Sequence, residues 1–113
     1  MRINHITLLV KDKQKAEDFY TKVLGFDKKE SEDYLWIKIG DQYIHITDKS
    51  GRPVKNTFYH FAIEVDDLFE YVKKIRSRGA DVFDFSKSRL QSFIKDPDGN
   101  LIEFIDTKDN FFK

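Results

Sequence analysis

The chain has 113 residues, which is the length of one domain. Its 20 basic residues balance 20 acidic ones, so the composition disfavours nucleic acid or an anionic membrane as a partner. Cysteine is absent, which excludes disulfides, thiolate metal ligands and a cysteine nucleophile. No segment approaches the roughly 20 apolar residues that a membrane helix needs. We therefore expect a soluble, cytoplasmic protein with a single domain over residues 1–113.

The first half of the chain predicts one strand, one helix and three more strands. Residues 3–10 form an apolar, β-rich run, and Asp12 follows at a position typical of a helix N-cap. The apolar residues of the expected helix recur at helical spacing: Ala16, Phe19, Tyr20, Val23 and Leu24. Gly25 is typical of the residue after a helix end. Three strands are then predicted, over residues 26–30, 34–39 and 42–47.

The second half predicts the same order after a polar linker over residues 48–57. A strand is expected over residues 58–65, and Asp67 and Glu70 then stand in the positions of a capping box. The helix that follows should end at Gly79. Three strands complete the pattern, over residues 81–85, 91–95 and 100–106. Pro97, Asp98 and Gly99 predict a tight turn between the last two strands, and the tail over residues 107–113 is left unassigned.

The repeated order predicts an α+β fold built from two tandem βαβββ modules, about 1–50 and about 57–107. The three histidines of the chain and Glu103 take matching places in this duplication. His5 and His60 lie in the first strand of each module, and His45 and Glu103 lie in the last. If equivalent positions meet near a pseudo-two-fold axis, these four side chains converge.

Imidazoles and a carboxylate within apolar strands indicate a metal centre. His45 stands between Ile44 and Ile46, and Glu103 between Ile102 and Phe104. Such groups are costly to bury unless they are paired or bound to metal. A single strand histidine is more often an ordinary or exposed side chain, and Glu103 alone could face solvent. The symmetric set of four favours a divalent ion, namely zinc, nickel, iron or manganese.

Further residues are candidates for a substrate pocket, each with a plainer alternative. Thr7 and Tyr43 share strand faces with His5 and His45, although ordinary packing would explain them equally well. Trp36 is a candidate platform for substrate, or else a core or interface residue. Arg89 and Gln91 could hold an anionic group, or belong to a solvated loop. Lysines such as Lys28 and Lys29 are interpreted as solvated faces.

Four segments resemble the vicinal-oxygen-chelate superfamily, which includes glyoxalase I, extradiol dioxygenases, fosfomycin-resistance thiol transferases and bleomycin-resistance proteins. The segments span nearly the whole chain: Asn4-His5-Ile6-Thr7-Leu8, Phe19-Tyr20-Thr21-Lys22-Val23-Leu24-Gly25-Phe26, His60-Phe61-Ala62-Ile63-Glu64-Val65-Asp66 and Asp96-Pro97-Asp98-Gly99-Asn100-Leu101-Ile102-Glu103-Phe104. The resemblance implies a cupped mixed sheet around the metal and a homodimer of the single-domain chain.

The resemblance also implies ligand roles. His5, His60 and Glu103 match the three ligands of dioxygenase-like and fosfomycin-type members, whereas His45 stands where glyoxalase I carries a second glutamate. Three neutral imidazoles and one carboxylate leave the site of a divalent ion at about +1, which favours an anionic oxygen ligand. Because His45 stands in place of that glutamate, the chain lacks the second carboxylate that a glyoxalase-type proton shuttle would use.

Two functional hypotheses lead, ahead of a third in which the chain is a metal-binding domain that has lost its activity. The first is a metal-dependent enzyme, either a lyase or isomerase or else a dioxygenase, acting on a small substrate chelated through adjacent oxygens. Glu103, as the ionised ligand, is then the candidate to move a proton. The second is a protein that sequesters a small molecule or antibiotic without metal, in a groove of Trp36 and tyrosine or phenylalanine side chains.

Overall fold

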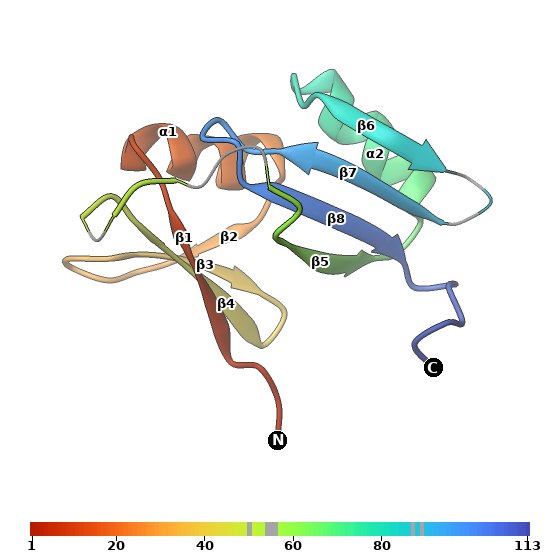
Figure 1. Cartoon of the computed structure of the whole chain (residues 1–113), viewed down its shortest axis with the longest axis horizontal. Helices are drawn as coiled ribbons and strands as arrows, with labels where there is room; N and C mark the ends of the chain where they lie inside the picture. Colours follow the sequence, from red (N-terminus) through yellow and green to blue (C-terminus); the bar gives the residue numbers. More distant parts are fainter. Residues whose placement is uncertain (50, 54–56, 87, 89) are drawn as a thin grey trace. The chain divides into compact units, whose positions relative to one another are not determined.

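The computed structural model describes residues 1–49, 51–53, 57–86, 88 and 90–113, arranged as two compact units. Unit 1 comprises Met1–Asn56 with Pro97–Asn100, and unit 2 comprises Thr57–Asp96 with Leu101–Lys113. Each unit holds a four-stranded mixed sheet and a helical segment (Figure 1). The α+β fold of two βαβββ modules is therefore confirmed. No helix in the described part of the chain is long and apolar enough to cross a membrane.

Unit 1 has the strand order β1-β4-β3-β2, with β1 parallel to β4 and the other pairs antiparallel. Its elements are β1 (His5–Leu9), α1 (Lys13–Asp18), η1 (Phe19–Val23), β2 (Asp27–Lys29), β3 (Leu35–Ile39) and β4 (Gln42–Thr47). The parallel neighbours β1 and β4 are not consecutive in the chain: the helical segment, β2 and β3 lie between them, a connection long enough for parallel strands.

The helical segment of unit 1 differs from the prediction in its second half. Asp12 caps α1 as expected, because its carboxylate accepts a hydrogen bond of 3.1 Å from the Lys15 amide. The predicted α-helix does not continue to Gly25, because the chain widens at Phe19 into the π-helix η1. Thr21 donates its hydroxyl hydrogen to the Glu17 carbonyl at 2.7 Å, a bond that competes with the backbone ladder of an α-helix.

The core of unit 1 lies between the helical segment and one face of the sheet. Its members are almost fully buried apolar side chains: Ala16, Tyr20, Leu24, Leu35, Ile37, Ile44 and Ile46. Because strand side chains alternate, the neighbouring residues of each strand lie on the opposite face. We call this opposite face the open face of unit 1; it carries His5, Thr7, Trp36, Tyr43 and His45.

Unit 2 repeats the arrangement, with the strand order β5-β8-β7-β6 and β5 parallel to β8. Its elements are β5 (His60–Val65), α2 (Leu68–Ser77), β6 (Val82–Ser86), β7 (Gln91–Lys95) and β8 (Leu101–Asp106). Asp67 caps α2 from the left-handed region at φ 50° and accepts from the Glu70 amide at 3.3 Å. Only this half of the expected capping box forms, since the Glu70 carboxylate pairs with Lys73 at 3.6 Å.

The core of unit 2 lies between α2 and one face of its sheet. Val72, Ile75, Ile94, Ile102 and Phe104 are almost fully buried there. Tyr71 meets the ring of Phe104 edge-on, and burial raises the pKa of the Tyr71 phenol above its usual value. The other face of the sheet, the open face of unit 2, carries His60 and Glu103.

The predicted turn at Pro97-Asp98-Gly99 belongs to unit 1, although the strands on either side of it belong to unit 2. Asp98 accepts a hydrogen bond from the Lys11 amide at 2.9 Å, and the Asn100 side chain donates to the Leu9 carbonyl at 3.1 Å. Gly99 supplies the positive φ of 88° that such a turn needs. These bonds tie the turn to the end of β1. Of the predicted linker over residues 48–57, residues 50 and 54–56 lie outside the described residues.

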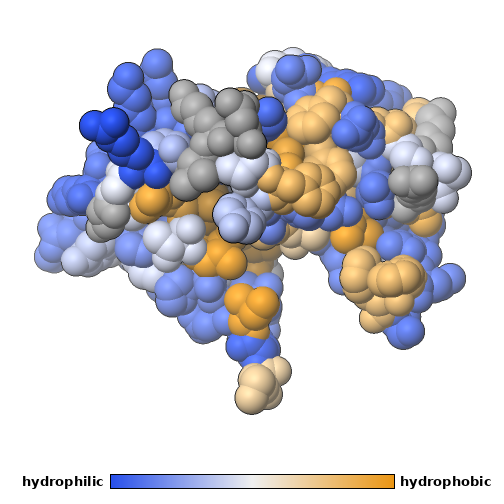
Figure 2. All heavy atoms as spheres, in the orientation of Figure 1, coloured by the Kyte–Doolittle hydropathy of each residue, from blue (hydrophilic) through white to orange (hydrophobic). Residues whose placement is uncertain are grey.

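Large apolar side chains of the described residues are exposed mainly toward the chain ends and just before β5. Figure 2 shows a largely hydrophilic surface with apolar atoms near both ends of the chain. The most exposed large apolar side chains of the described residues are those of Met1, Ile3, Tyr34, Phe58, Tyr59, Phe111 and Phe112.

Candidate functional site

The open face of unit 1 is ordered by strand register into cross-strand rows. One row runs Lys29, Trp36, His45 and Thr7 across β2, β3, β4 and β1. The next row runs Asp27, Lys38, Tyr43 and His5 across the same strands. Two histidines, a tryptophan and a tyrosine therefore come together because the register places them in adjacent rows.

Trp36 holds both histidines of this face in ring contacts. The His45 imidazole stacks on the indole, with the ring centres 4.5 Å apart and the planes 15° apart. His5 meets the same indole edge-on at 5.1 Å. The Nδ1 atom of His5 lies 2.9 Å from the Asn4 side-chain oxygen, whereas the Nε2 atom of His45 is buried with no hydrogen-bond partner among the described residues. A buried imidazole nitrogen without a partner is a costly arrangement that a metal ion would relieve.

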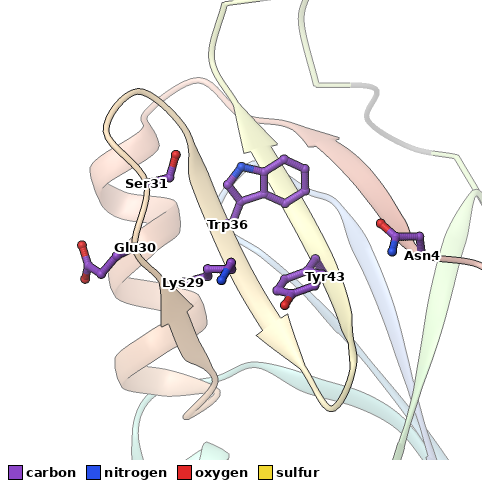
Figure 3. A pocket seen from close by; sticks show the side chains of 6 residues that line it. All are labelled: Asn4, Lys29, Glu30, Ser31, Trp36 and Tyr43. Carbon is purple, nitrogen blue, oxygen red and sulfur yellow. The ribbon is translucent and has the colours of Figure 1, made fainter.

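A pocket of about 330 Å³ opens on the same face. It is lined by Asn4, Lys29, Glu30, Ser31, Trp36 and Tyr43 (Figure 3). Two of the predicted pocket residues, Trp36 and Tyr43, are thus part of it. Thr7 lies on the open face beside His45 and does not line the pocket.

The open face of unit 2 brings His60 and Glu103 into direct contact. The Nε2 atom of His60 lies 3.1 Å from Oε1 of Glu103, and the two side chains are 22 % and 14 % exposed. The Nδ1 atom of His60 lies 2.8 Å from the Phe58 carbonyl oxygen. Phe58 and Phe93 both meet the imidazole edge-on, at 4.8 and 5.4 Å, so aromatic rings flank the histidine of the pair.

These contacts determine which nitrogen of the His60 ring is free to bind a metal ion. A carbonyl oxygen only accepts, so Nδ1 carries the hydrogen and donates it to Phe58. In the neutral ring the Nε2 lone pair then faces a carboxylate oxygen, and two acceptors 3.1 Å apart need a proton or a cation shared between them. A nitrogen and a carboxylate oxygen in this arrangement fit a divalent metal ion, and an Nδ1–H bond to a carbonyl is the usual support of such a ligand.

The two remaining predicted pocket residues, Gln91 and Arg89, are not part of the His60–Glu103 pair as the structure describes it. Gln91 is half-buried on β7 of unit 2, so it does not line the pocket of unit 1. Arg89 lies outside the described residues.

Strand register puts the four predicted ligands in equivalent positions of the two units. His5 and His60 are the first residues of β1 and β5. Two residues further along these strands, Thr7 is paired with His45, and Ala62 is paired with Glu103. Within the described residues, no group of three or more His, Asp or Glu side chains is placed to hold a metal ion. The structure thus presents one histidine pair and one histidine–glutamate pair, and the convergence of the two pairs on one ion stays a prediction.

Sequence reasoning missed four pocket residues: Asn4, Lys29, Glu30 and Ser31. Lys29 was interpreted as part of a solvated face, and it is indeed exposed. Its neighbour Lys28 lies on the opposite face of β2 and pairs with Glu17 at 3.1 Å. Alternation along the strand would have separated the two lysines, but only the register between β2 and β3 places Lys29 beside Trp36.

The paired βαβββ units, each with a histidine-bearing open face, define a protein of the glyoxalase-like fold class. Solved structures share this fold. A protein assigned to the glyoxalase family from Bacillus anthracis aligns with a TM-score of 0.82 at 24 % identity, over 96 % of each chain. TnmS3, an antibiotic-binding protein from Streptomyces sp. CB03234, aligns with a TM-score of 0.81 at 23 % identity, over 94 % of this chain and 95 % of that one.

The sequence comparison gives the family itself. Residues 2–104 match the model of the Glyoxalase/Bleomycin resistance protein/Dioxygenase superfamily, and the chain belongs to this superfamily. The lactoylglutathione lyase of Neisseria meningitidis serogroup A is 30 % identical, over 96 % of this chain and 92 % of the relative.

Proposed function

We propose that the protein is a metal-dependent, glyoxalase-like enzyme that acts on a small substrate bound through adjacent oxygens. A lyase or isomerase reaction is the leading class, and a dioxygenase reaction is the next. The observation that carries the proposal is the contact of His60 Nε2 with Glu103 Oε1 at 3.1 Å, with His60 Nδ1 already committed to the Phe58 carbonyl. The name of the Neisseria relative, lactoylglutathione lyase, supports the lyase class.

In this proposal His5, His45, His60 and Glu103 hold the metal, which is zinc, nickel, iron or manganese. All three imidazoles are suited to the role, because His5 and His60 each have an oxygen acceptor at Nδ1, and the buried Nε2 of His45 has no partner in the described part of the chain. When bound, the ion supplies a Lewis acid that polarises a substrate oxygen. The set contains one carboxylate, so it neutralises less of the ion's charge than a set with two glutamates would.

The roles of the protein's own groups follow from their surroundings. Glu103 is the carboxylate of the set, so its carboxylate group is the acceptor for a substrate proton, as in general base catalysis. The Phe58 carbonyl fixes the orientation of the His60 ring. Phe93, which is 8 % exposed beside His60, limits the access of water to the pair. We further propose that the enzyme works in the cytoplasm as a homodimer.

The test joins metal analysis with a Glu103→Gln variant. Protein purified without chelator should contain one divalent ion per chain, identified by mass spectrometry and by anomalous scattering from crystals. Gln keeps the size of Glu103 and removes its charge, so we expect metal affinity to fall by about 10- to 100-fold, with activity lost in parallel. The matched control, Glu70→Gln, removes an exposed carboxylate on α2 and should retain metal and activity.

The activity assay starts from methylglyoxal and glutathione, with formation of lactoylglutathione followed through its thioester absorbance. A panel of 2-oxo acids and catechols extends the search to isomerase and dioxygenase reactions. Protein that holds no stoichiometric metal, or a Glu103→Gln variant with full activity, would contradict the proposal.

A second candidate function is the capture of a small molecule or antibiotic without chemistry. The pocket of about 330 Å³, with Trp36 and Tyr43 in its lining, favours it. Aromatic rings provide a large apolar contact area for a flat ligand. This function predicts that removing metal with a chelator leaves ligand affinity intact, whereas the enzyme hypothesis predicts that affinity falls.

A further inference from the structure

We propose that the pocket of unit 1 binds the acidic end of an elongated substrate, with Lys29 as the residue that selects a carboxylate. The substrate would lie along the row Lys29, Trp36 and His45, with its adjacent oxygens at the His45 end. The position given to the adjacent oxygens rests on the proposed function. The position given to the acidic end rests on the pocket alone.

The first step is the direction of the row. Lys29 on β2 is paired with Trp36 on β3, and Trp36 is paired with His45 on β4. Neighbouring strands are about 4.8 Å apart, so the backbones of Lys29 and His45 are about 10 Å apart. A molecule that reaches both ends of this row is longer than a simple three-carbon compound.

The second step is the surface between the two ends. The His45 ring covers one face of the Trp36 indole at 4.5 Å, and Tyr43 meets the indole edge-on at 6.2 Å. Both Trp36 and Tyr43 line the pocket, so its floor is aromatic. Such a floor fits a flat, apolar middle section of a ligand.

The third step is the charge. Lys29 lines the pocket, and in Figure 3 its side chain extends toward Tyr43. No ion pair of Lys29 occurs within the described part of the chain, whereas Lys28 on the other face is paired with Glu17. Glu30 also lines the pocket, but Figure 3 shows its carboxylate directed away from Trp36 and Tyr43. The ammonium group is therefore the charge that the pocket presents to a ligand, and its natural partner is a carboxylate.

The experiment uses two probes that differ only in charge. 3,4-Dihydroxybenzoate has adjacent oxygens, a flat ring and a carboxylate, and 3,4-dihydroxybenzamide replaces the carboxylate with a neutral amide. Trp36 is the one tryptophan of the chain and lines the pocket, so its fluorescence reports binding directly. The full-length protein, with the metal content of each sample measured, is titrated with both probes.

We expect the acid to bind the unmodified protein about 10-fold more tightly than the amide, the scale of a charge-assisted hydrogen bond. Lys29→Met should bring this ratio close to 1 by weakening the acid and leaving the amide unchanged. Lys38→Met is the matched control, because Lys38 lies on the same face in the neighbouring row and does not line the pocket. It should retain the ratio.

The outcomes separate this assignment from the proposed function. A ratio near 1 in metal-containing protein would overturn the acidic subsite and leave the enzyme proposal standing. An equal loss of the ratio in Lys38→Met and Lys29→Met would also overturn it, since general surface charge would then explain the preference. A ratio that depends on Lys29 in protein without metal, unchanged by chelator, would support the subsite and count against the metal-dependent function.

Discussion

Asp106 is a buried carboxylate at the end of β8, and its replacement by Asn should destabilise the protein in a pH-dependent way. The side chain accepts two backbone hydrogen bonds, from the Leu68 amide at 2.9 Å and the Lys108 amide at 2.8 Å. Leu68 is the first residue of α2, so one bond satisfies a helix-end donor. Asn has one acceptor oxygen, and its amide group would face the second donor. We expect a loss of about 2 kcal/mol of unfolding free energy, the scale for bonds to a charged group.

The pH dependence follows from the same bonds. The Leu68 amide first, and then the Lys108 amide, holds the pKa of Asp106 below its usual value. A lowered pKa means that the stabilisation is present above a pH of about 4, where the unfolded chain is also ionised, and is lost as the pH falls through the native pKa. The stability difference between the natural protein and Asp106→Asn should therefore shrink below pH 4.

The measurement is urea unfolding followed by circular dichroism at pH 7 and at several values down to pH 3, with thermal unfolding at pH 7. A loss of about 2 kcal/mol corresponds to a melting temperature about 8 °C lower for a chain of this size. Asp81→Asn is the control, because Asp81 is exposed and makes no hydrogen bond or ion pair within the described residues. A variant as stable as the natural protein at pH 7, or a deficit that persists unchanged at pH 3, would refute the reasoning.

Three more changes test the core, a helix end and the histidine platform. Ile37→Ala empties a fully buried position in unit 1 and should cost about 3 kcal/mol in urea unfolding, whereas a loss below 1 kcal/mol would mean that the site is loosely packed. Gly79→Ala should cost about 1 kcal/mol through backbone strain alone, because its φ is +98° and a Cβ would meet no atom within 4 Å; an unchanged midpoint would contradict this. Trp36→Leu removes the ring that stacks on His45 and should weaken metal retention about 10-fold in competition with a chelator, while unchanged retention would show that the stack does not position the ligand.

Most of the fold was predictable because local signals and apolar periodicity agree. The strands Gln42–Thr47 and Gln91–Lys95 have the predicted bounds, and both capping aspartates act as expected. The π-helix Phe19–Val23 was not predictable from apolar spacing, because the stripe that indicates an α-helix is equally compatible with one wider turn. Within it the Thr21 hydroxyl donates to the Glu17 carbonyl at 2.7 Å, a contact that the apolar spacing does not reveal.

The equivalent positions of the four candidate ligands were predictable from the duplication, whereas the pocket residues that depend on strand register were not. The repeat alone pointed to His5, His45, His60 and Glu103, and the pairing of β1 with β4 and of β5 with β8 puts them in equivalent positions. Lys29 was hidden, because its short exposed strand has no apolar pattern to fix which residue of β3 it faces. The Phe58 carbonyl that orients His60 is a backbone atom, which no residue type in the sequence reveals.

The Asp98 turn completes unit 1 with residues that come from the second repeat of the sequence. The Lys11 amide and the Leu9 carbonyl, both in the first repeat, take partners that the chain supplies only 87 and 91 residues later. A fragment cut after residue 56 would lack this turn, and its first strand would end with a donor and an acceptor exposed to water.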